Sequence, residues 1–465
     1  DHRDLHSFPT RRSSDLKSLA GWKRIINIGL INMYYKGVNL FMKIGIYGAS
    51  TQSGKAFLAD FLMKGYSVYG YARQSLHGME FINEIRKNNG IMLERPDNVI
   101  GEESKFIELR NSRVGSNLDE LVNHSDIIVI SHPSQYIEET VMNLKKANII
   151  EKRIPLVLGC SRTLATPYIW DVLGKDYPVV CFSTLPYSSK SLSLGSVFIK
   201  RRKRNWMASL EGEFKNEDIN IIEEIFPQVL YNRVPASTSL GNIGAVFHAA
   251  PYMLNYEEIK KYEREGKTYS FYVQGIMERK DVGEFIEAID QTRLHIAHYL
   301  GLPVFGYSIS PREERWKEIM KRMRKAELEY IDNIEELRIL RHDYLEEINN
   351  SILSAQHWLD VTYGVRRIEG ESIGSAIGRT PTYQQMSVPQ KRYVEEDIPT
   401  GLVPLEALAK RFNINHDEIS YIIDLYDKTF NLDSRAKGRN VEKFETEFLT
   451  KYLTGELFKA YEYAI

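Results

Sequence analysis

Cysteine is scarce in this chain, with only Cys160 and Cys181 among 465 residues, and each lies in an apolar stretch. This scarcity argues against a disulfide framework and a cysteine zinc site, and it predicts two buried, reduced thiols, as in a cytoplasmic protein. Long apolar runs are lacking too. A membrane-spanning helix needs roughly 18 uninterrupted apolar residues, and the nearest stretch, residues 25–42, is broken by three asparagines and a lysine. We therefore expect no membrane partner.

An excess of charge of one sign is also absent. Lysine and arginine number 61, aspartate and glutamate 62, and the formal net charge is −1. A nucleic-acid-binding protein carries a basic face, so we expect no nucleic-acid partner. The chain has no internal repeat and no low-complexity tract, and its composition is that of an ordinary globular protein. Its length predicts two or three domains.

The first 41 residues differ from the rest of the chain. The segment from Asp1 to Leu16 is polar and aperiodic and resembles translated sequencing-adapter sequence. Met42, in contrast, is followed at once by a short apolar run that predicts a first strand. We expect residues 1–41 to be a non-native or disordered leader, and we leave them out of the functional interpretation.

Short apolar runs alternate with helical periods over residues 42–233. They predict strands at residues 43–48, 66–71, 126–130, 155–158 and 178–182, with helices between them at 55–64 and 137–146. The continuous apolar run at 126–130 is typical of a strand that is covered on both faces. Residues 197–200 and 219–230 complete this region. The alternation predicts parallel crossovers and an α/β doubly wound domain of the Rossmann type.

After about residue 234 the pattern changes to long helical periods, at residues 282–300, 311–344 and from 405 through 429. We therefore expect residues 234–465 to form a mainly α-helical domain. The segment 312–348 is strongly charged and predicts a solvated helix face. A contact in a homodimer is the alternative for that segment.

A glycine-containing loop, residues 48–54, lies between the first strand and the first helix. A dinucleotide pyrophosphate binds at this position, on backbone amides at a helix N-terminus. Gly48 permits the tight turn and Gly54 permits close packing of helix on strand. Ser50 replaces the middle glycine of G-x-G-x-x-G, and the last glycine falls one residue late. We predict a cofactor loop that includes Gly48, Ser50, Thr51 and Gly54, with a purely structural turn as the alternative.

The end of the second strand indicates which cofactor binds. An NAD enzyme usually has an acidic residue here for the ribose diol, but residues 71–75 read Tyr-Ala-Arg-Gln-Ser. Arg73 can pair with a 2′-phosphate through two hydrogen bonds, and Ser75 can add a hydroxyl. We therefore predict NADP(H), with NAD(H) as the alternative. Arg73 could also be an ordinary surface residue.

Three residues suggest acid–base chemistry on a carboxylate substrate. His248 is the single imidazole in an apolar, helix-like run; such a histidine is more often a satisfied core residue, but it can supply a proton near neutral pH. Asp397 is the candidate carboxylate to fix its tautomer. Arg392 can grip a substrate carboxylate. We expect Pro399 and its neighbours Gly401 and Pro404 to keep this segment from forming a regular helix.

Three other histidines are discounted. His132 follows the strand at 126–130, where we expect a loop role. His295 and His298 lie three residues apart on one predicted helix, but no cluster of cysteine or acidic residues completes a metal site. We predict structural roles for all three, and no metal.

Several blocks of the sequence resemble the octopine/nopaline (opine) dehydrogenases. The resemblance spans nearly all of residues 43–430, and its most specific block is the segment from Arg392 to Pro404. The other blocks are the glycine loop and residues 184–187, 242–255, 287–300 and 362–383. The resemblance implies a Rossmann dinucleotide-binding domain, residues 42–233, followed by a catalytic α-helical domain, residues 234–465. The second domain would be like the C-terminal domain of 6-phosphogluconate dehydrogenase.

The same resemblance implies the reaction and the site. Family enzymes reductively condense an amino acid with a 2-oxo acid, with the active site between the two domains. The catalytic histidine of the family matches His248, its aspartate matches Asp397, and its substrate-binding arginine matches Arg392. Asn255 is a further substrate-binding candidate, with buried hydrogen bonding as the alternative.

This chain departs from the family before the histidine, at residues 244–245, and after Leu-Pro-Tyr, at residues 188–190. These departures put the identity of the substrate in doubt. Two other functions remain open: a 2-oxo or 3-oxo acid reductase on the same fold, and a non-catalytic NADP(H) sensor.

Overall fold

A computed structural model describes most of the chain: residues 42–96, 103–202, 206–227, 229–241, 243–305, 351–384, 388–389 and 391–459, with a few positions between 315 and 340. The expected leader, residues 1–41, lies outside the described residues, as does most of the charged helix expected at 311–344.

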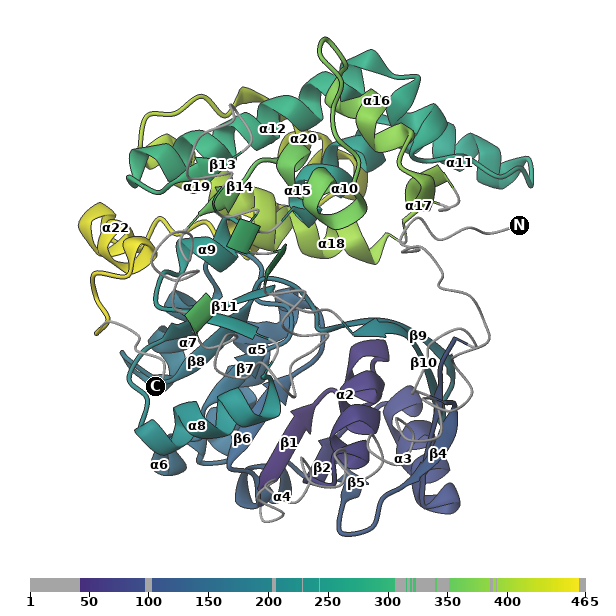
Figure 1. Cartoon of the computed structure of the whole chain (residues 1–465), viewed down its shortest axis with the longest axis vertical. Coiled ribbons are helices and arrows are strands. Elements are labelled where there is room, and N and C mark those ends of the chain that lie inside the picture. Colours follow the sequence, from purple (N-terminus) through teal and green to yellow (C-terminus); the bar gives the residue numbers. More distant parts are fainter. Residues whose placement is uncertain are drawn as a thin grey trace, which may run out of the picture.

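An eight-stranded sheet forms the first half of the molecule, which we call the sheet half, residues 42–232 (Figure 1). The strand order is β12-β11-β8-β7-β6-β1-β2-β5. The central strands are parallel, and Ile44 lies opposite both Val68 and Ile127. The strands are β1 (Lys43–Tyr47), β2 (Ser67–Tyr71), β5 (Arg113–Gly115), β6 (Ile127–Ile130), β7 (Leu156–Leu158), β8 (Val179–Phe182), β11 (Trp206–Glu211) and β12 (Val229–Asn232).

All five predicted strands are present, each within one residue of its expected bounds. The pairing of β11 with β8 is antiparallel, so β11 and its parallel neighbour β12 run opposite to the other six strands. The helix that was expected at 55–64 begins three residues earlier, as α2 (Gln52–Met63), and α5 (Ile137–Lys146) has the predicted bounds.

Helices cover both faces of the sheet. Successive residues of β6 belong to different cores: Ile127 and Val129 pack with Phe57 of α2, whereas Ile128 and Ile130 pack with Val141 of α5. This division explains why the strand is apolar at every position. The other helices of this half are α3 (Leu76–Asn88), α4 (Leu118–His124), α6 (Ile149–Lys152), α7 (Ala165–Leu173) and α8 (Asn216–Ile225). The sheet is therefore doubly wound, as predicted.

A second sheet, in the order β4-β3-β10-β9, was not predicted. It is made of β3 (Gly90–Glu94), β4 (Lys105–Glu108), β9 (Tyr187–Ser193) and β10 (Ser196–Arg202). Strand β9 carries four serines and is exposed over its second half, so it lacks the apolar pattern that marks a strand. Its partners fix it from outside: Gln52 donates to the Ser189 carbonyl, and the ammonium of buried Lys55 donates to the Ser191 hydroxyl at 2.7 Å.

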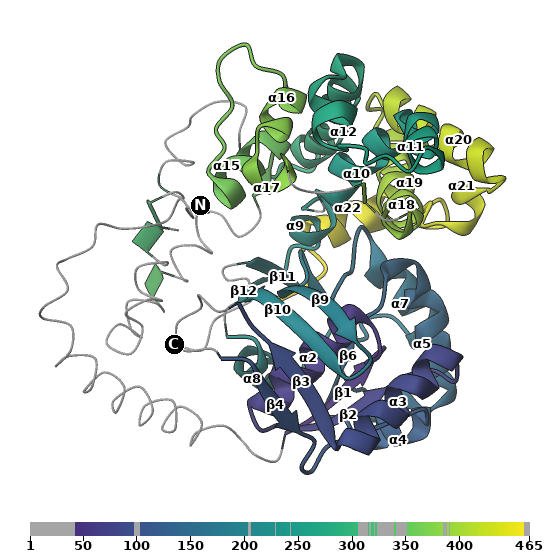
Figure 2. The same cartoon turned by 90° about the vertical axis from the view of Figure 1, so that its right-hand side faces the viewer.

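Helices make up most of the described residues between 234 and 459, which we call the helical half (Figure 2). Helix α10 lies inside it and contacts α12, α18 and α20. The region expected as one helical period from 405 through 429 is two helices, because Asn413 between them has a positive φ of 53°. The helices are α9 (Ala236–Ser239), α10 (Gly244–Leu254), α11 (Tyr256–Arg264), α12 (Lys280–Tyr299), α15 (Ala355–Tyr363), α16 (Ile373–Gly378), α17 (Pro381–Gln384), α18 (Arg392–Asp397), α19 (Val403–Arg411), α20 (Asp417–Phe430), α21 (Ser434–Lys437) and α22 (Thr446–Thr454), with π-helical turns η2 (Val273–Met277) and η3 (Ile398–Leu402) and a two-stranded pair, β13 (Val304–Phe305) with β14 (Ile352–Leu353).

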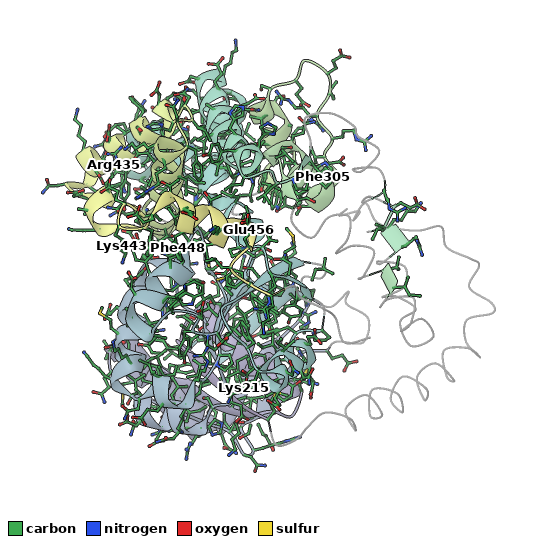
Figure 3. All side chains as sticks on the ribbon, turned by 90° about the vertical axis from the view of Figure 1, so that its left-hand side faces the viewer. Lys215, Phe305, Arg435, Lys443, Phe448 and Glu456 are labelled. Carbon is green, nitrogen blue, oxygen red and sulfur yellow. The ribbon has the colours of Figure 1, made fainter. Side chains whose placement is uncertain are left out.

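The last helix, α22, returns to the sheet half. Figure 3 shows Lys443 and Phe448 of this segment where the two halves meet. Lys443 pairs with Asp171, and the Tyr452 hydroxyl donates to the buried carboxylate of Glu211. Burial raises the pKa of Glu211. The segment that contains α22 therefore connects the halves in addition to the chain that follows β12.

Neither half offers a membrane-spanning element in its described residues, since no helix there combines the necessary length and apolarity.

Candidate active site

The glycine loop after β1 has the geometry of a nucleotide-binding turn. Gly48 has a φ of +91°, which favours glycine. Thr51 caps α2: its hydroxyl accepts from the Gly54 N–H at 3.0 Å and donates to the Gly48 carbonyl at 2.8 Å. A Cβ on Gly54 would lie 2.1 Å from that same carbonyl oxygen. The loop therefore tolerates no side chain at residue 54, and it places the first amides of α2, which have no partner inside the helix, at the carboxyl edge of the sheet.

The end of β2 fits the other end of a dinucleotide. Arg73 is exposed, and Ser75 caps α3 by accepting from the Gly78 N–H at 3.2 Å, which leaves its own hydroxyl hydrogen free to donate. A depression of about 410 Å³ lies beside them, lined by Tyr71, Gln74, Ser116, Asn117 and Leu118. The residues at this edge therefore fit a nicotinamide dinucleotide: amides for the pyrophosphate, and a cation and a hydroxyl beyond the second strand.

His248 lies on α10 with its side chain 22% exposed. Its Nδ1 is 2.9 Å from Oδ2 of Asp397, whose side chain is completely buried. The Tyr393 ring packs edge-on against the imidazole at 5.4 Å. No hydrogen-bond partner of Nε2 is found in the described part of the chain. The imidazole is therefore fixed at one nitrogen and available at the other.

The segment that carries Asp397 is helical, which corrects our expectation. Residues 392–397 form α18, and the chain passes through the π-helical turn η3 directly into α19. Pro399 lies inside this turn, where the Thr400 hydroxyl donates to the Glu396 carbonyl at 2.6 Å. The wider turn absorbs the proline without ending the helix. Because Tyr393 and Asp397 are four residues apart, both face His248.

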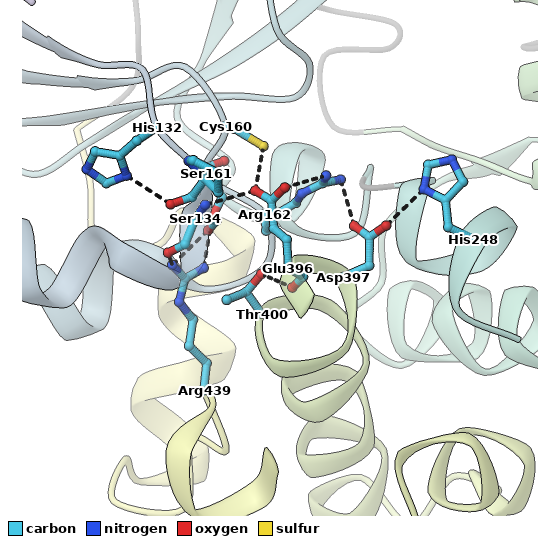
Figure 4. A network of polar contacts seen from close by, with 11 residues as sticks. His132, Ser134, Cys160, Ser161, Arg162, His248, Glu396, Asp397, Thr400 and Arg439 are labelled. Carbon is cyan, nitrogen blue, oxygen red and sulfur yellow. Dashed lines mark hydrogen bonds and ion pairs between the residues drawn. The ribbon is translucent and has the colours of Figure 1, made fainter. Parts of the chain in front are cut away.

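Arg162, which the sequence analysis missed, contacts the far side of Asp397 (Figure 4). It follows β7, and its Nη1 lies 3.1 Å from Asp397 Oδ1 while its Nη2 lies 3.2 Å from Glu396 Oε2. Burial by itself would raise the pKa of Asp397, but the charge of Arg162 and then the hydrogen bond from His248 outweigh it and hold that pKa below its usual value. The available signal was its position just beyond the carboxyl end of a parallel strand.

Glu396 is held by groups of the sheet half. Its Oε1 accepts from the Ser134 N–H at 2.8 Å and from the Cys160 thiol at 3.2 Å (Figure 4). Burial raises the pKa of Cys160, so the thiol stays protonated. Cys181 is buried and Cys160 is half-buried, and both are free thiols, so the prediction of two buried thiols holds in full only for Cys181.

Arg392 begins α18 and is exposed. Its guanidinium lies over the Tyr393 ring at 5.3 Å, next to the ring that touches His248. Arg392 has no ion pair with any residue that the structure describes. The structure therefore brings a cation that is available to a ligand into the neighbourhood of the His248–Asp397 pair.

Asn255 has no group left for a substrate. Its amide donates to the carbonyls of Pro251 and Gly275 at 2.7 and 2.8 Å, and its oxygen accepts from Tyr269 and Arg279. The side chain is 1% exposed. The interpretation of Asn255 as a substrate-binding residue is therefore corrected: buried hydrogen bonding, the alternative, accounts for it.

The other histidines have structural surroundings. Both ring nitrogens of His132 are within hydrogen-bonding distance of a partner, the Pro133 carbonyl at 2.9 Å and the Thr140 hydroxyl at 2.7 Å. His295 and His298 are exposed on α12. Within the described ranges, no group of three or more His, Cys, Asp or Glu side chains is placed to hold a metal ion.

Comparison with known proteins gives a consistent result. Residues 234–429 match the family model of the NAD/NADP octopine/nopaline dehydrogenase α-helical domain. An opine dehydrogenase of Arthrobacter sp. (strain 1C) is 24% identical over 405 residues, which cover 85% of this chain and 93% of that protein. An octopine dehydrogenase solved with NADH and L-arginine has a TM-score of 0.63 at 13% identity, covering 91% of this chain and 100% of the other.

A yersinopine dehydrogenase solved with NADP⁺ has a TM-score of 0.55 at 11% identity and covers 89% of this chain and 94% of its own. The predicted fold class, a Rossmann-type sheet followed by a mainly α-helical region, is thereby confirmed.

Replacing Gly54 by alanine should weaken dinucleotide binding, because the new methyl group would push the Gly48 carbonyl out of the turn. We expect the Kd for NADPH to rise at least about tenfold, as for the loss of one good charge-assisted contact. Fluorescence titration of NADPH measures this value. Gly283→Ala is the matched control, since its Cβ would make ordinary contacts at 3.5 Å; equal affinities in the two variants would contradict the assignment of the loop.

Proposed function

We propose that this chain is an NAD(P)H-dependent opine dehydrogenase, because residues 234–429 match the family model of the octopine/nopaline dehydrogenase α-helical domain. It condenses the amine of an amino acid with the carbonyl of a 2-oxo acid and reduces the resulting imine. The observation that carries the proposal is the 2.9 Å contact between His248 and Asp397, next to Arg392. The domain boundary we propose falls between residues 233 and 234, after the last strand of the sheet.

The substrate class rests on the relatives. Octopine dehydrogenase has been solved with L-arginine, with agmatine and with pyruvate. We infer that this chain also takes an amino acid and a 2-oxo acid. The two substrates share a feature that the site can recognise, because each carries a carboxylate next to the reacting centre.

His248 is the proposed acid–base residue. Asp397 accepts a hydrogen bond from Nδ1–H, so the neutral ring carries its free lone pair on Nε2. When that nitrogen is protonated, the buried carboxylate stabilises the imidazolium, and the proton can pass to a substrate. In the reverse direction Nε2 accepts it. The hydride itself comes from the bound nicotinamide, the chemistry that such a cofactor supplies.

Arg392 is the proposed anchor for a substrate carboxylate. Its exposed guanidinium has two parallel N–H groups to offer, which match a carboxylate. Its place beside Tyr393 puts that carboxylate near the imidazole. A substrate held there has its reacting carbon in a fixed position relative to His248, and this fixed orientation lowers the barrier of the reaction.

We further propose NADP(H) as the preferred cofactor. The second strand ends at Tyr71 without an acidic residue for the ribose diol, while Arg73 is exposed and Ser75 retains a hydroxyl hydrogen. A 2′-phosphate would pair with both. The glycine loop, through Gly48 and Thr51, would hold the pyrophosphate in either cofactor.

The function is tested by coenzyme oxidation at pH 7.5, followed by absorbance. NADPH should be oxidised in the presence of pyruvate, glyoxylate or 2-oxoglutarate only when amino acids are also present.

His248→Ala should lower kcat by at least about a thousandfold, because the variant loses both the proton transfer and the positioning that the imidazole provides. The Kd for NADPH should stay unchanged. The control is His295→Ala, on an exposed position of α12. Oxidation with an oxo acid alone would indicate a hydroxy-acid dehydrogenase, and NADPH binding without turnover a sensor.

Arg392→Met should raise the KM for the substrate whose carboxylate it holds by about 10–100-fold, the effect of losing a charged hydrogen bond of about 1.5–3 kcal/mol. Steady-state kinetics with each substrate varied in turn identify that substrate. Arg264→Met, on the exposed surface of α11, serves as the comparison. Unchanged KM values for both substrates would remove Arg392 from the site.

Arg73→Gln should raise the Kd for NADPH about tenfold and leave the Kd for NADH unchanged, because only NADPH carries the phosphate that the arginine would contact. Titration of both coenzymes with the same variant provides an internal control. A parallel loss for both coenzymes, or for neither, would show that Arg73 does not select the cofactor.

A further inference from the structure

The loop that follows β7, residues 160–164, lies against the helical half in an unusual backbone conformation. Arg162 and Leu164 both have a positive φ of 55°, which non-glycine residues rarely adopt. Two carbonyl groups of the helical half hold the loop in place. The Thr163 N–H donates to the Thr400 carbonyl at 3.1 Å, and the Thr163 hydroxyl donates to the Ser239 carbonyl at 2.9 Å. A strained backbone at such a junction indicates that its side chains have a role to fill.

Arg162 is the residue that this loop delivers to the dyad. Its side chain is 15% exposed and forms ion pairs with Asp397 and Glu396, two adjacent residues of α18. The Asp397 carboxylate is thus divided between two partners: Oδ1 faces a guanidinium from the sheet half, and Oδ2 faces the imidazole of His248. Although burial alone would lower the pKa of Arg162, the Asp397 charge raises it well above its usual value, so the guanidinium stays charged.

From this geometry, and on the premise that His248 and Asp397 form the proposed catalytic pair, we propose that Arg162 is a positioning residue. It comes from the sheet half, keeps the buried Asp397 carboxylate ionised and turns it toward His248. Asp397 therefore has both of its partners only where the two halves are docked. Arg162 itself touches neither nitrogen of the imidazole.

The charged and titratable groups around His248 define what Arg162 does to it. They are Arg392, Tyr393, Glu396 and Asp397 on α18, Cys160 and Arg162 on the loop after β7, and Tyr272 at the start of η2. Burial raises the pKa values of Cys160 and Tyr272, so both are neutral at physiological pH. The remaining charged groups are two cations, Arg162, which pairs with Asp397, and Arg392, which lies over the Tyr393 ring, and one further anion, Glu396, which pairs with Arg162.

The sign of the effect follows from electrostatics. The dyad has a charge of −1 when the imidazole is neutral and 0 when it is protonated. A nearby cation stabilises the −1 form, so removing the charge of Arg162 raises the pH at which the dyad takes up its proton, whichever atom carries it. Removing the negative charge of Glu396 shifts that pH in the opposite direction.

The test is the pH titration of the His248 imidazole by NMR, in ¹⁵N-histidine-labelled protein without substrates, with His248→Gln to assign the signal. Arg162→Gln should raise the midpoint by about one pH unit or more, as expected for the loss of a unit charge at this range in a half-buried site. Glu396→Gln should lower it. Arg162→Lys keeps the charge but not the two-pronged donor; its midpoint should stay near the wild-type value, with kcat about tenfold lower.

Arg439→Gln is the matched control. Arg439 is also a buried arginine at the junction, and its guanidinium donates to carbonyls of Ser134, Ser161 and Thr163, but it has no contact with Asp397 in Figure 4. This variant should lose thermal stability and keep the midpoint. A purely structural Arg162 would behave in the same way.

Coinciding midpoints in the wild type, Arg162→Gln and Glu396→Gln would overturn the proposal. If Arg162→Gln does not fold, the near-isosteric Glu396→Gln decides alone: a lowered midpoint supports the coupling and an unchanged one refutes it. Because the titration needs no substrate, it remains decisive if the chain turns over no amino acid with any oxo acid. In that case the proposed function fails while the positioning role of Arg162 is still measured.

Discussion

The carboxylate of Asp397 has no exposed surface, and the junction between the sheet half and the helical half has to supply the partners that its charge needs. An ionised carboxylate taken out of water loses several kcal/mol of solvation unless opposite charge and hydrogen bonds replace it. Here Arg162 and His248 replace it from two sides, and each belongs to a different half. The burial of one charge thus ties the docking of the halves to the protonation chemistry of the imidazole.

Most of the fold could be predicted from the sequence, because apolar runs such as residues 126–130 report directly on burial. Strand β9 could not, since it is held by its pairing with β10 and by hydrogen bonds from Gln52 and Lys55 of a neighbouring helix rather than by an apolar pattern of its own. The helical course of residues 392–411 was missed for a related reason. Pro399 predicts a break in an α-helix, but a π-helical turn accommodates it.

Part of the candidate site could also be predicted from the sequence, and part could not. His248, Asp397 and Arg392 could be predicted, because their residue types and the spacing of Arg392 and Asp397 are recognisable. Arg162 has no such local signal: it lies 234 positions from Glu396, and only the folded chain brings the two together. Asn255 illustrates the opposite error, a polar residue near the histidine whose hydrogen bonds are all used inside the helical half. Proximity in sequence to a catalytic candidate is a weaker guide than an unused donor or acceptor.

The contact between Tyr452 and Glu211 has a consequence for how the protein is made. The two residues are 241 positions apart, so a ribosome that synthesises about 5–20 residues per second exposes Glu211 for tens of seconds before Tyr452 emerges. During that interval the Ser209 hydroxyl of the sheet half can already donate to Oε1 of Glu211, but Oε2 lacks the Tyr452 hydroxyl. The hydrogen bond that completes the surroundings of this buried carboxyl group therefore waits for α22, and the last step in folding this part of the sheet half is coupled to the docking of that helix.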